Sequence, residues 1–241
     1  MILKERHRAG IRVATNFNYF RDDLIRFDRR RFRGLGEKHT ARFVAHVVGI
    51  CDSYDFSHYN GVLYIMKAMC FLGSHMFDDP RFPQLDQAMR GSTRYGDMRV
   101  QMLSQEVEAI LTRFAGPKLK IYHSMLSASL ASLDEELPIA TAGNRILTSL
   151  PLDTATYVVQ NWQSHLYASA KEAADALGFK EERSRTICLG AAAILGFRFY
   201  RDPLYPWVQD LTKDSRSGEL ERFLKKRIVK QLQRIEAHYG L

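Results

Sequence analysis

The side chains that most often carry out chemistry are present in this chain, but their spacing matches no recognised catalytic or metal-binding motif. His39 and His46 lie two helical turns apart, too far for both to hold one metal ion without further ligands. Cys70 and His75 are separated by five positions and so point in different directions from one helix, which disfavours a thiolate–imidazole pair. We therefore expect no metal ligands at these positions.

Glycine-rich and nucleophile motifs are also absent from the sequence. It contains no phosphate-binding loop, no dinucleotide-binding glycine pattern and no G-x-S-x-G turn. We predict no catalytic residues and no cofactor, and hence a protein that is not an enzyme. An enzyme whose residues meet only in three dimensions is a remaining alternative.

Anion binding is the chemistry that the composition favours. The chain has a formal net charge of +8 and a pI near 9.4. Arg29, Arg30, Arg31 and Arg33 surround Phe32, and Lys225-Lys226-Arg227 lies in the last predicted helix. Such groups can contact phosphates or an acidic protein surface, although a solvated helix face has the same composition.

One pattern, L-G-x-x-x-x-x-D-P-x-aromatic-P, occurs twice, over residues 72–83 and 195–206. The same offset, with no gap, aligns Asp52 with Asp175 and Phe56 with Phe179. This register predicts that the chain is an internal duplication. The second copy has Arg201 where the first has Asp78, so the adjacent carboxylates at the first corner are not repeated.

Each Asp-Pro corner follows an apolar helical run and should end it. Proline disfavours helical geometry at the preceding residue and has no N–H to donate. We expect Asp79 and Asp202 to act as N-caps of new helices that begin at the following proline, each stabilising its helix by about 0.5–2 kcal/mol.

Apolar residues recur at spacings of three and four along the chain, and no segment alternates for long enough to form a strand. We predict an all-α protein in which two similar helical units pack as one bundle-like body. The expected divisions are a basic amphipathic helix (1–36), a first unit with a connecting helix (37–133), a connection (134–152) and a second unit (153–241).

The sequence also bears on location. No apolar run is long enough to span a bilayer, so no membrane insertion is expected, and the N-terminus becomes charged too early for a signal peptide. Cys51, Cys70 and Cys188 are odd in number and form no C-x-x-C pair, which is typical of buried, reduced thiols. We expect a cytoplasmic protein.

The corner segments resemble small bacterial helical proteins with a repeated LG-x-x-F-x-x-DP-x-x-PW pattern, often encoded beside type VI secretion effectors. The first copy has Gln84 in place of the tryptophan. The resemblance implies an immunity protein, or a chaperone or adaptor, that binds a secreted toxin or effector. Nucleic-acid binding is the alternative. Phe77 stands one position later than the phenylalanine of the pattern. The residues that carry the resemblance are Phe43, Leu72, Gly73, Phe77, Asp79, Pro80 and Pro83, and then Leu195, Gly196, Phe199, Asp202, Pro203, Pro206 and Trp207.

Two surfaces are candidates for binding the partner, because arginine and large aromatic residues dominate interface energetics. One is the run of Arg29, Arg30, Arg31 and Arg33. The other is the second corner, which we favour because duplicated copies diverge where they bind. The alternative at this corner is that Trp207 fills the core. The second surface consists of Arg198, Arg201, Tyr205 and Trp207.

Overall fold

The computed structural model describes residues 16–79, 81–91, 96–149, 152–211 and 217–240, and in these ranges the chain is all-α, as predicted. Residues 16–27 are helical. The helices that follow are α2 (Arg29–Ser53), α3 (Tyr59–Leu72), α4 (Pro83–Arg90), α5 (Gly96–Ala115), α6 (Lys120–Asp134), α7 (Ile139–Thr148), α8 (Leu152–Leu177), α9 (Glu182–Leu195) and α10 (Ser217–Tyr239). Short 3-10 turns occupy Pro117–Leu119, Phe199–Arg201 and Pro206–Asp210.

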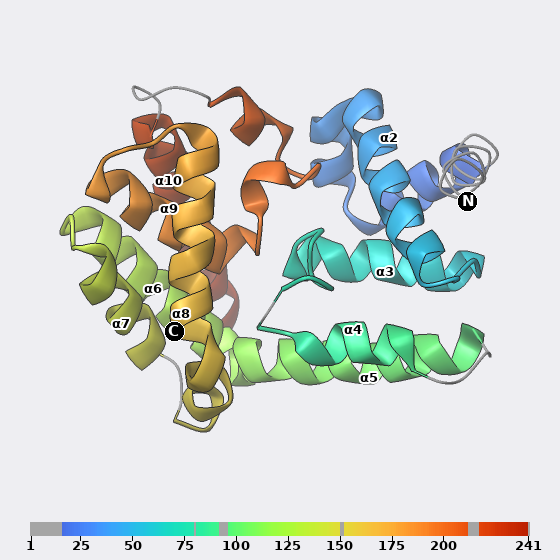
Figure 1. Cartoon of the computed structure of the whole chain (residues 1–241), viewed down its shortest axis with the longest axis horizontal. Coiled ribbons are helices and arrows are strands. Elements are labelled where there is room, and N and C mark those ends of the chain that lie inside the picture. Colours follow the sequence, from blue (N-terminus) through green and yellow to red (C-terminus); the bar gives the residue numbers. More distant parts are fainter. Residues whose placement is uncertain (1–15, 80, 92–95, 150–151, 212–216, 241) are drawn as a thin grey trace.

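The helices form two groups along the long axis of the molecule. Figure 1 shows α2 and α3 above α4 and α5 on one side, and α6 to α10 gathered on the other. A buried apolar core extends through both groups, from Phe43 and Met66 to Ala191 and Leu224. One set of buried apolar residues therefore connects the two groups.

Helix bounds repeat at the offset of the sequence motif, which is 123 residues. Helices α3 and α9 each have 14 residues and begin 123 positions apart. The same offset relates the first residues of α2 and α8, and it relates Pro83, where α4 begins, to Pro206, where a 3-10 turn begins. A duplicated chain would show this order of elements, although the duplication itself stays a prediction.

The predicted boundary near residue 36 coincides with a bend in the structure, whereas the predicted connection at 134–152 contains a helix. Gly36 leaves helical geometry (φ 75°, ψ 169°) and bends α2, as a glycine break predicts. The connection, however, contains the helix α7, which we did not expect. A Cβ at Gly143 would lie 2.4 Å from Tyr167 Oη, so this glycine permits close packing of α7 on α8 rather than a turn.

The predicted N-caps at the two corners are wrong. The elements after the corners begin at the second proline of each motif, with Phe82 and Tyr205 at the N-cap positions. Asp79 and Asp202 instead start tight turns, in which the carboxylate accepts the amide two residues later (3.0 and 2.8 Å) and the carbonyl accepts the amide of the aromatic residue (2.9 Å in each turn). A proline directly after Asp favours this turn, and the second proline suits the first helical position.

The two corners meet at their glycines. Gly73 and Gly196 have φ of 91° and 104°, and a Cβ at Gly196 would lie 2.9 Å from Leu72 O and 3.1 Å from Gly73 Cα. Beside this contact, buried Asp202 accepts the amide of Ser74 (2.9 Å). We call this contact, with Gly73, Ser74, Gly196 and Asp202, the glycine joint. It brings residues of the two motifs into direct contact across the centre of the molecule.

Substitution of Gly196 by Ala should lower the free energy of unfolding much more than substitution of a glycine with free space around it. The added Cβ meets backbone atoms in a conformation that only glycine adopts readily, so we expect a loss of more than about 2 kcal/mol. Gly178→Ala is the control, because Gly178 also has positive φ (74°) but nothing within 4 Å, and it should cost about 1 kcal/mol. Urea denaturation measures both, and equal losses would contradict close contact at the joint.

Removal of the Asp202 carboxylate should also be costly. Asp202→Ala leaves the buried amides of Ser74 and Leu204 without their acceptor, at about 1–3 kcal/mol for each amide. Asp78→Ala, at the first corner, removes only an exposed ion pair with Arg198 and should cost at most about 1 kcal/mol. If the two variants lost equal stability in urea, the hydrogen bonds of Asp202 would not hold the joint.

Candidate functional site

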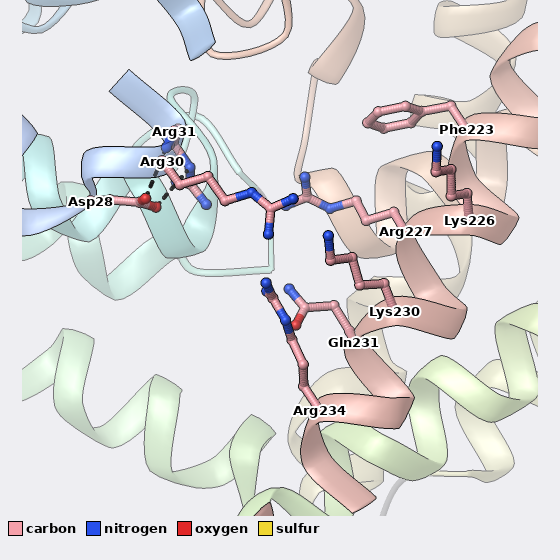
Figure 2. A pocket seen from close by; sticks show the side chains of 9 residues that line it. All are labelled: Asp28, Arg30, Arg31, Phe223, Lys226, Arg227, Lys230, Gln231 and Arg234. Atoms are coloured by element: carbon pink, nitrogen blue, oxygen red, sulfur yellow. Dashed lines mark hydrogen bonds and ion pairs between the residues drawn. The ribbon is translucent and has the colours of Figure 1, made fainter. Parts of the chain in front are cut away.

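Two adjoining cavities lie between the start of α2, the second corner and α10. The first, of about 420 Å³, we call the aromatic groove. It is lined by Arg31, Gly34, Leu35, His39, Leu204, Tyr205, Pro206, Trp207, Phe223 and Arg227. The second, of about 400 Å³, we call the basic pocket (Figure 2). It is lined by Asp28, Arg30, Arg31, Phe223, Lys226, Arg227, Lys230, Gln231 and Arg234.

Arg31, Phe223 and Arg227 line both cavities, so the groove and the pocket form one continuous surface. Arg31 is held in place from two directions. Asp28 caps α2 by accepting the Arg31 amide (2.9 Å) and lies 3.4 Å from Arg31 Nε, while Arg31 Nη1 donates to the carbonyl of Cys70 (2.6 Å). This last bond attaches the start of α2 to the end of α3, close to the glycine joint.

The walls of the aromatic groove are formed by aromatic rings that contact one another and a guanidinium group. The rings of Trp207 and Phe223 lie 4.1 Å apart, inclined at 47°, and the Arg227 guanidinium lies 5.6 Å from the ring of Tyr205. Tyr205 is buried and Trp207 is partly buried. Burial raises the pKa of Tyr205, so its hydroxyl stays neutral. Trp207 therefore packs on the core but also lines the groove, a position between the two alternatives that the sequence left open.

The basic pocket follows one face of α10. Lys226, Lys230 and Arg234 recur every four residues and share a face with Arg227 and Gln231. The opposite face of the helix is apolar and buried, through Leu220, Leu224, Ile228, Leu232 and Ile235. The helix is amphipathic because the core takes one face, which leaves the basic face toward α2.

Most cations of the pocket have no acidic partner in the described ranges. Asp28, its one carboxylate, pairs with Arg31. No described carboxylate lies within 4.0 Å of Arg30, Lys226, Arg227, Lys230 or Arg234. Repulsion by Arg30 is the largest cause that lowers the pKa of Lys230, followed by burial and by Arg234 and Lys226. The pocket therefore concentrates positive charge that the described residues do not balance.

The structure brings together half of the residues that the sequence singled out. Arg30 and Arg31 line the basic pocket, and Tyr205 and Trp207 line the aromatic groove. The two candidate surfaces thus meet at one place, through Arg31, which faces both cavities.

The other four candidates lie outside these cavities. Arg29 and Arg33 are exposed on α2. Arg198 pairs with Asp78 of the first corner (3.1 Å), and exposed Arg201 lies over the ring of Tyr200. The structure gives Arg198 a role in bridging the two corners.

Lys230, Arg234 and Phe223 belong to the site but were not predicted. For Lys230 and Arg234, the available signal was their spacing of four and eight residues from Lys226 along the last helix. That spacing is also typical of a solvated helix face. Lys225, the neighbour of Lys226, turns away and pairs with Asp134 (2.8 Å) and Glu221 (3.0 Å). A run of three basic residues therefore contributes two members to the site and one to a surface ion-pair network.

The histidines and cysteines show no metal-binding arrangement within the described part of the chain, where no group of three or more His, Cys, Asp or Glu side chains gathers. All three cysteines are buried, as predicted. Burial raises the pKa of Cys70 to about 11 and of Cys188 to about 12, so these thiols stay protonated. Burial, with the neighbouring His46 and Arg198, lowers the pKa of His75 to about 4.

Comparison with models of known protein families, with curated proteins and with solved structures finds no match to this chain. Among the residues that the structure describes, no helix combines the length and the apolar character needed to cross a bilayer. The function must therefore be inferred from the groove, the pocket and the corner motif.

The charge repulsion in the basic pocket predicts a measurable coupling. Arg30→Gln and Lys230→Gln should each raise the melting temperature at low salt, because each removes one of two like charges. Together they should raise it by less than the sum of the single changes, since the first change already relieves the repulsion.

The coupling between Arg30 and Lys230 should vanish in 1 M NaCl, where charges are screened over about 3 Å. Arg222→Gln, at an exposed site on α10 outside the pocket, is the matched control and should not couple to Arg30→Gln. Thermal melts of all five variants test this, and additive effects at low salt would mean that the two side chains do not face each other.

Proposed function

We propose that this chain is a non-enzymatic cytoplasmic protein that binds another protein along the aromatic groove and the basic pocket. The observation that carries the proposal is the meeting of Arg31, Trp207 and Phe223 at one concave surface, from three segments distant in the sequence. Tryptophan, tyrosine and arginine are the residues that most often dominate binding energy at protein interfaces. They do so where the partner covers them and excludes water, and the aromatic groove offers such residues on a concave surface.

The charge and the aromatic residues of this surface indicate which side chains the partner would present. Its binding segment would place an apolar side chain against Trp207 and Phe223 and acidic side chains toward Arg227 and Lys230. Arginine suits this role because its planar guanidinium forms paired hydrogen bonds with carboxylates. The positive net charge of the chain would also accelerate encounter with an acidic protein.

The class of partner comes from the resemblance of the corner motif. Proteins with this motif are often encoded beside type VI secretion effectors, so we propose a bacterial effector or toxin as the partner. The role would be immunity, in which the protein neutralises the toxin, or that of a chaperone or adaptor that holds the effector before export.

Divergence between the proposed duplicated copies supports the second corner as the binding surface. At the first corner, Phe82 is buried and packs against Phe114 of α5 at 5.7 Å, and Gln84 stands where the second copy has Trp207. At the second corner, the aromatic residues open onto a cavity instead. If the second corner served only to pack the fold, its aromatic residues would be expected to be covered as Phe82 is, and not to line a cavity.

Nucleic-acid binding is the second candidate, and the five cations without described carboxylate partners favour it. A single strand could place phosphates over the basic pocket and stack a base on Trp207. This mode predicts a steep loss of affinity with salt, because each neutralised phosphate releases counterions. Prior nuclease digestion, or competition by a short poly-dT strand, separates it from protein binding.

The proposed function is tested at Trp207. We expect Trp207→Ala to weaken binding of the partner at least tenfold, because the side chain forms a wall of the groove. The partner is first captured from a nuclease-treated bacterial lysate, identified by mass spectrometry, and then titrated as a purified protein by calorimetry. Phe71→Ala is the matched control, since Phe71 is 63% exposed on α3 and lies outside the groove.

Three outcomes would decide against the proposal. They are loss of the captured protein with the Phe71 variant as much as with the Trp207 variant, unchanged affinity for Trp207→Ala, and capture of nucleic acid alone from a parallel lysate that has not been treated with nuclease. Co-expression with the captured effector separates the two roles, because an immunity protein restores growth and an adaptor instead raises the amount of effector secreted.

A further inference from the structure

The basic pocket gathers five cations that no described carboxylate pairs with. We propose that it is a binding site for a ligand with two or more linked phosphate groups, either free pyrophosphate or the diphosphate of a nucleotide. The inference does not rest on the proposed protein partner, because its evidence is the geometry and charge of the pocket itself.

Charge is the first argument. Five cations that face the pocket, Arg30, Lys226, Arg227, Lys230 and Arg234, have no acidic partner among the described residues. Single cations elsewhere on the surface, such as Arg29 and Arg222, also have no described carboxylate within 4.0 Å, but the pocket gathers five such cations around one hollow. A bound anion would relieve the repulsion among them.

Geometry is the second argument. Figure 2 shows the side chains of Arg30, Arg227, Lys230 and Arg234 extending toward one another from α2 and α10. Along α10, Lys226 and Arg234 lie eight residues apart, about 12 Å at the rise of an α-helix. One phosphate is too small to contact cations over this length, whereas two linked phosphates can contact Arg30 and Arg227 together with lysines on successive turns.

The size of the pocket favours phosphate over carboxylate. One phosphate monoester carries about −1.5 to −2 charges and three acceptor oxygens. Two linked phosphates therefore supply several negative charges within the 400 Å³ of the pocket. Carboxylates carry one charge each, and four of them, each on its own carbon stem, would need more room. Arginine and lysine are also the residues that bind phosphate most often, through forked and single hydrogen bonds.

Phe223 gives the site a second element of recognition. It lines the pocket and its ring lies 4.1 Å from that of Trp207 in the aromatic groove, so an aromatic base attached to the diphosphate would have a surface to pack on. The diphosphate is the shared chemistry, and the base distinguishes a nucleotide from the free anion.

Calorimetric titration of the full chain with sodium pyrophosphate in 50 mM NaCl tests the inference. We expect one site per chain, with inorganic phosphate and citrate at least tenfold weaker. ADP in the same titration separates the two sources, since tighter binding than pyrophosphate identifies a nucleotide and equal binding identifies the diphosphate alone.

Variants localise the site. Arg30→Gln and Lys230→Gln should each weaken pyrophosphate at least tenfold, while Arg222→Gln, on the same helix but outside the pocket, should leave the affinity within twofold of wild type. Thermal melts of the same proteins show that each is folded.

The inference is overturned if pyrophosphate does not bind at 50 mM NaCl, if citrate binds as tightly, or if the pocket variants bind like the Arg222 variant. Binding of poly-dT without binding of pyrophosphate would also overturn it and would favour nucleic acid. Failure of the protein-partner experiment with successful pyrophosphate binding leaves this inference intact, so the two proposals fail separately.

Discussion

The close contact of Gly73 with Gly196 determines where both walls of the candidate site lie. Only residues without a Cβ allow the two backbones to approach this closely, and Asp202 secures the contact by accepting the Ser74 amide. On one side, the turn that starts at Asp202 leads directly to Tyr205 and Trp207. On the other, the end of α3 just before Gly73 offers the Cys70 carbonyl to Arg31. Displacement of the joint would therefore move the two walls of the aromatic groove relative to each other.

Local signals in the sequence were sufficient to predict the all-α class. The periodicity of apolar residues indicated helices throughout, because helices such as α6 and α10 each have a continuous buried face. Where the prediction failed, a glycine or an aspartate had a tertiary role that local rules do not contain. Gly143 is explained by Tyr167 of another helix, and Asp202 is explained by the amide of Ser74.

The site was predictable only in part, because its residues come from segments brought together by the fold. Arg30 and Trp207 each stood out by type, one in a basic run and the other at a motif position, but nothing in the sequence placed them near one another. There was even less reason in the sequence to assign Lys230 to a site, since a lysine on an amphipathic helix is usually a solvated residue. Its significance depends on Arg30, which faces it from a helix about two hundred residues earlier in the sequence.

The distribution of ion pairs is a reason to treat the basic pocket as functional rather than as an ordinary charged surface. On the side of α10 that faces α6 and α9, Lys225 and Glu221 pair with Asp134 and Arg183, so cations and carboxylates are matched. Across the helix, Lys226 and Lys230 face α2 and are matched by no described carboxylate. One helix thus has a neutralised face that packs within the protein and a positive face that opens to solvent. Repulsion on the open face gives the folded protein no stability, so binding of an anion is the property that this arrangement of charges would serve.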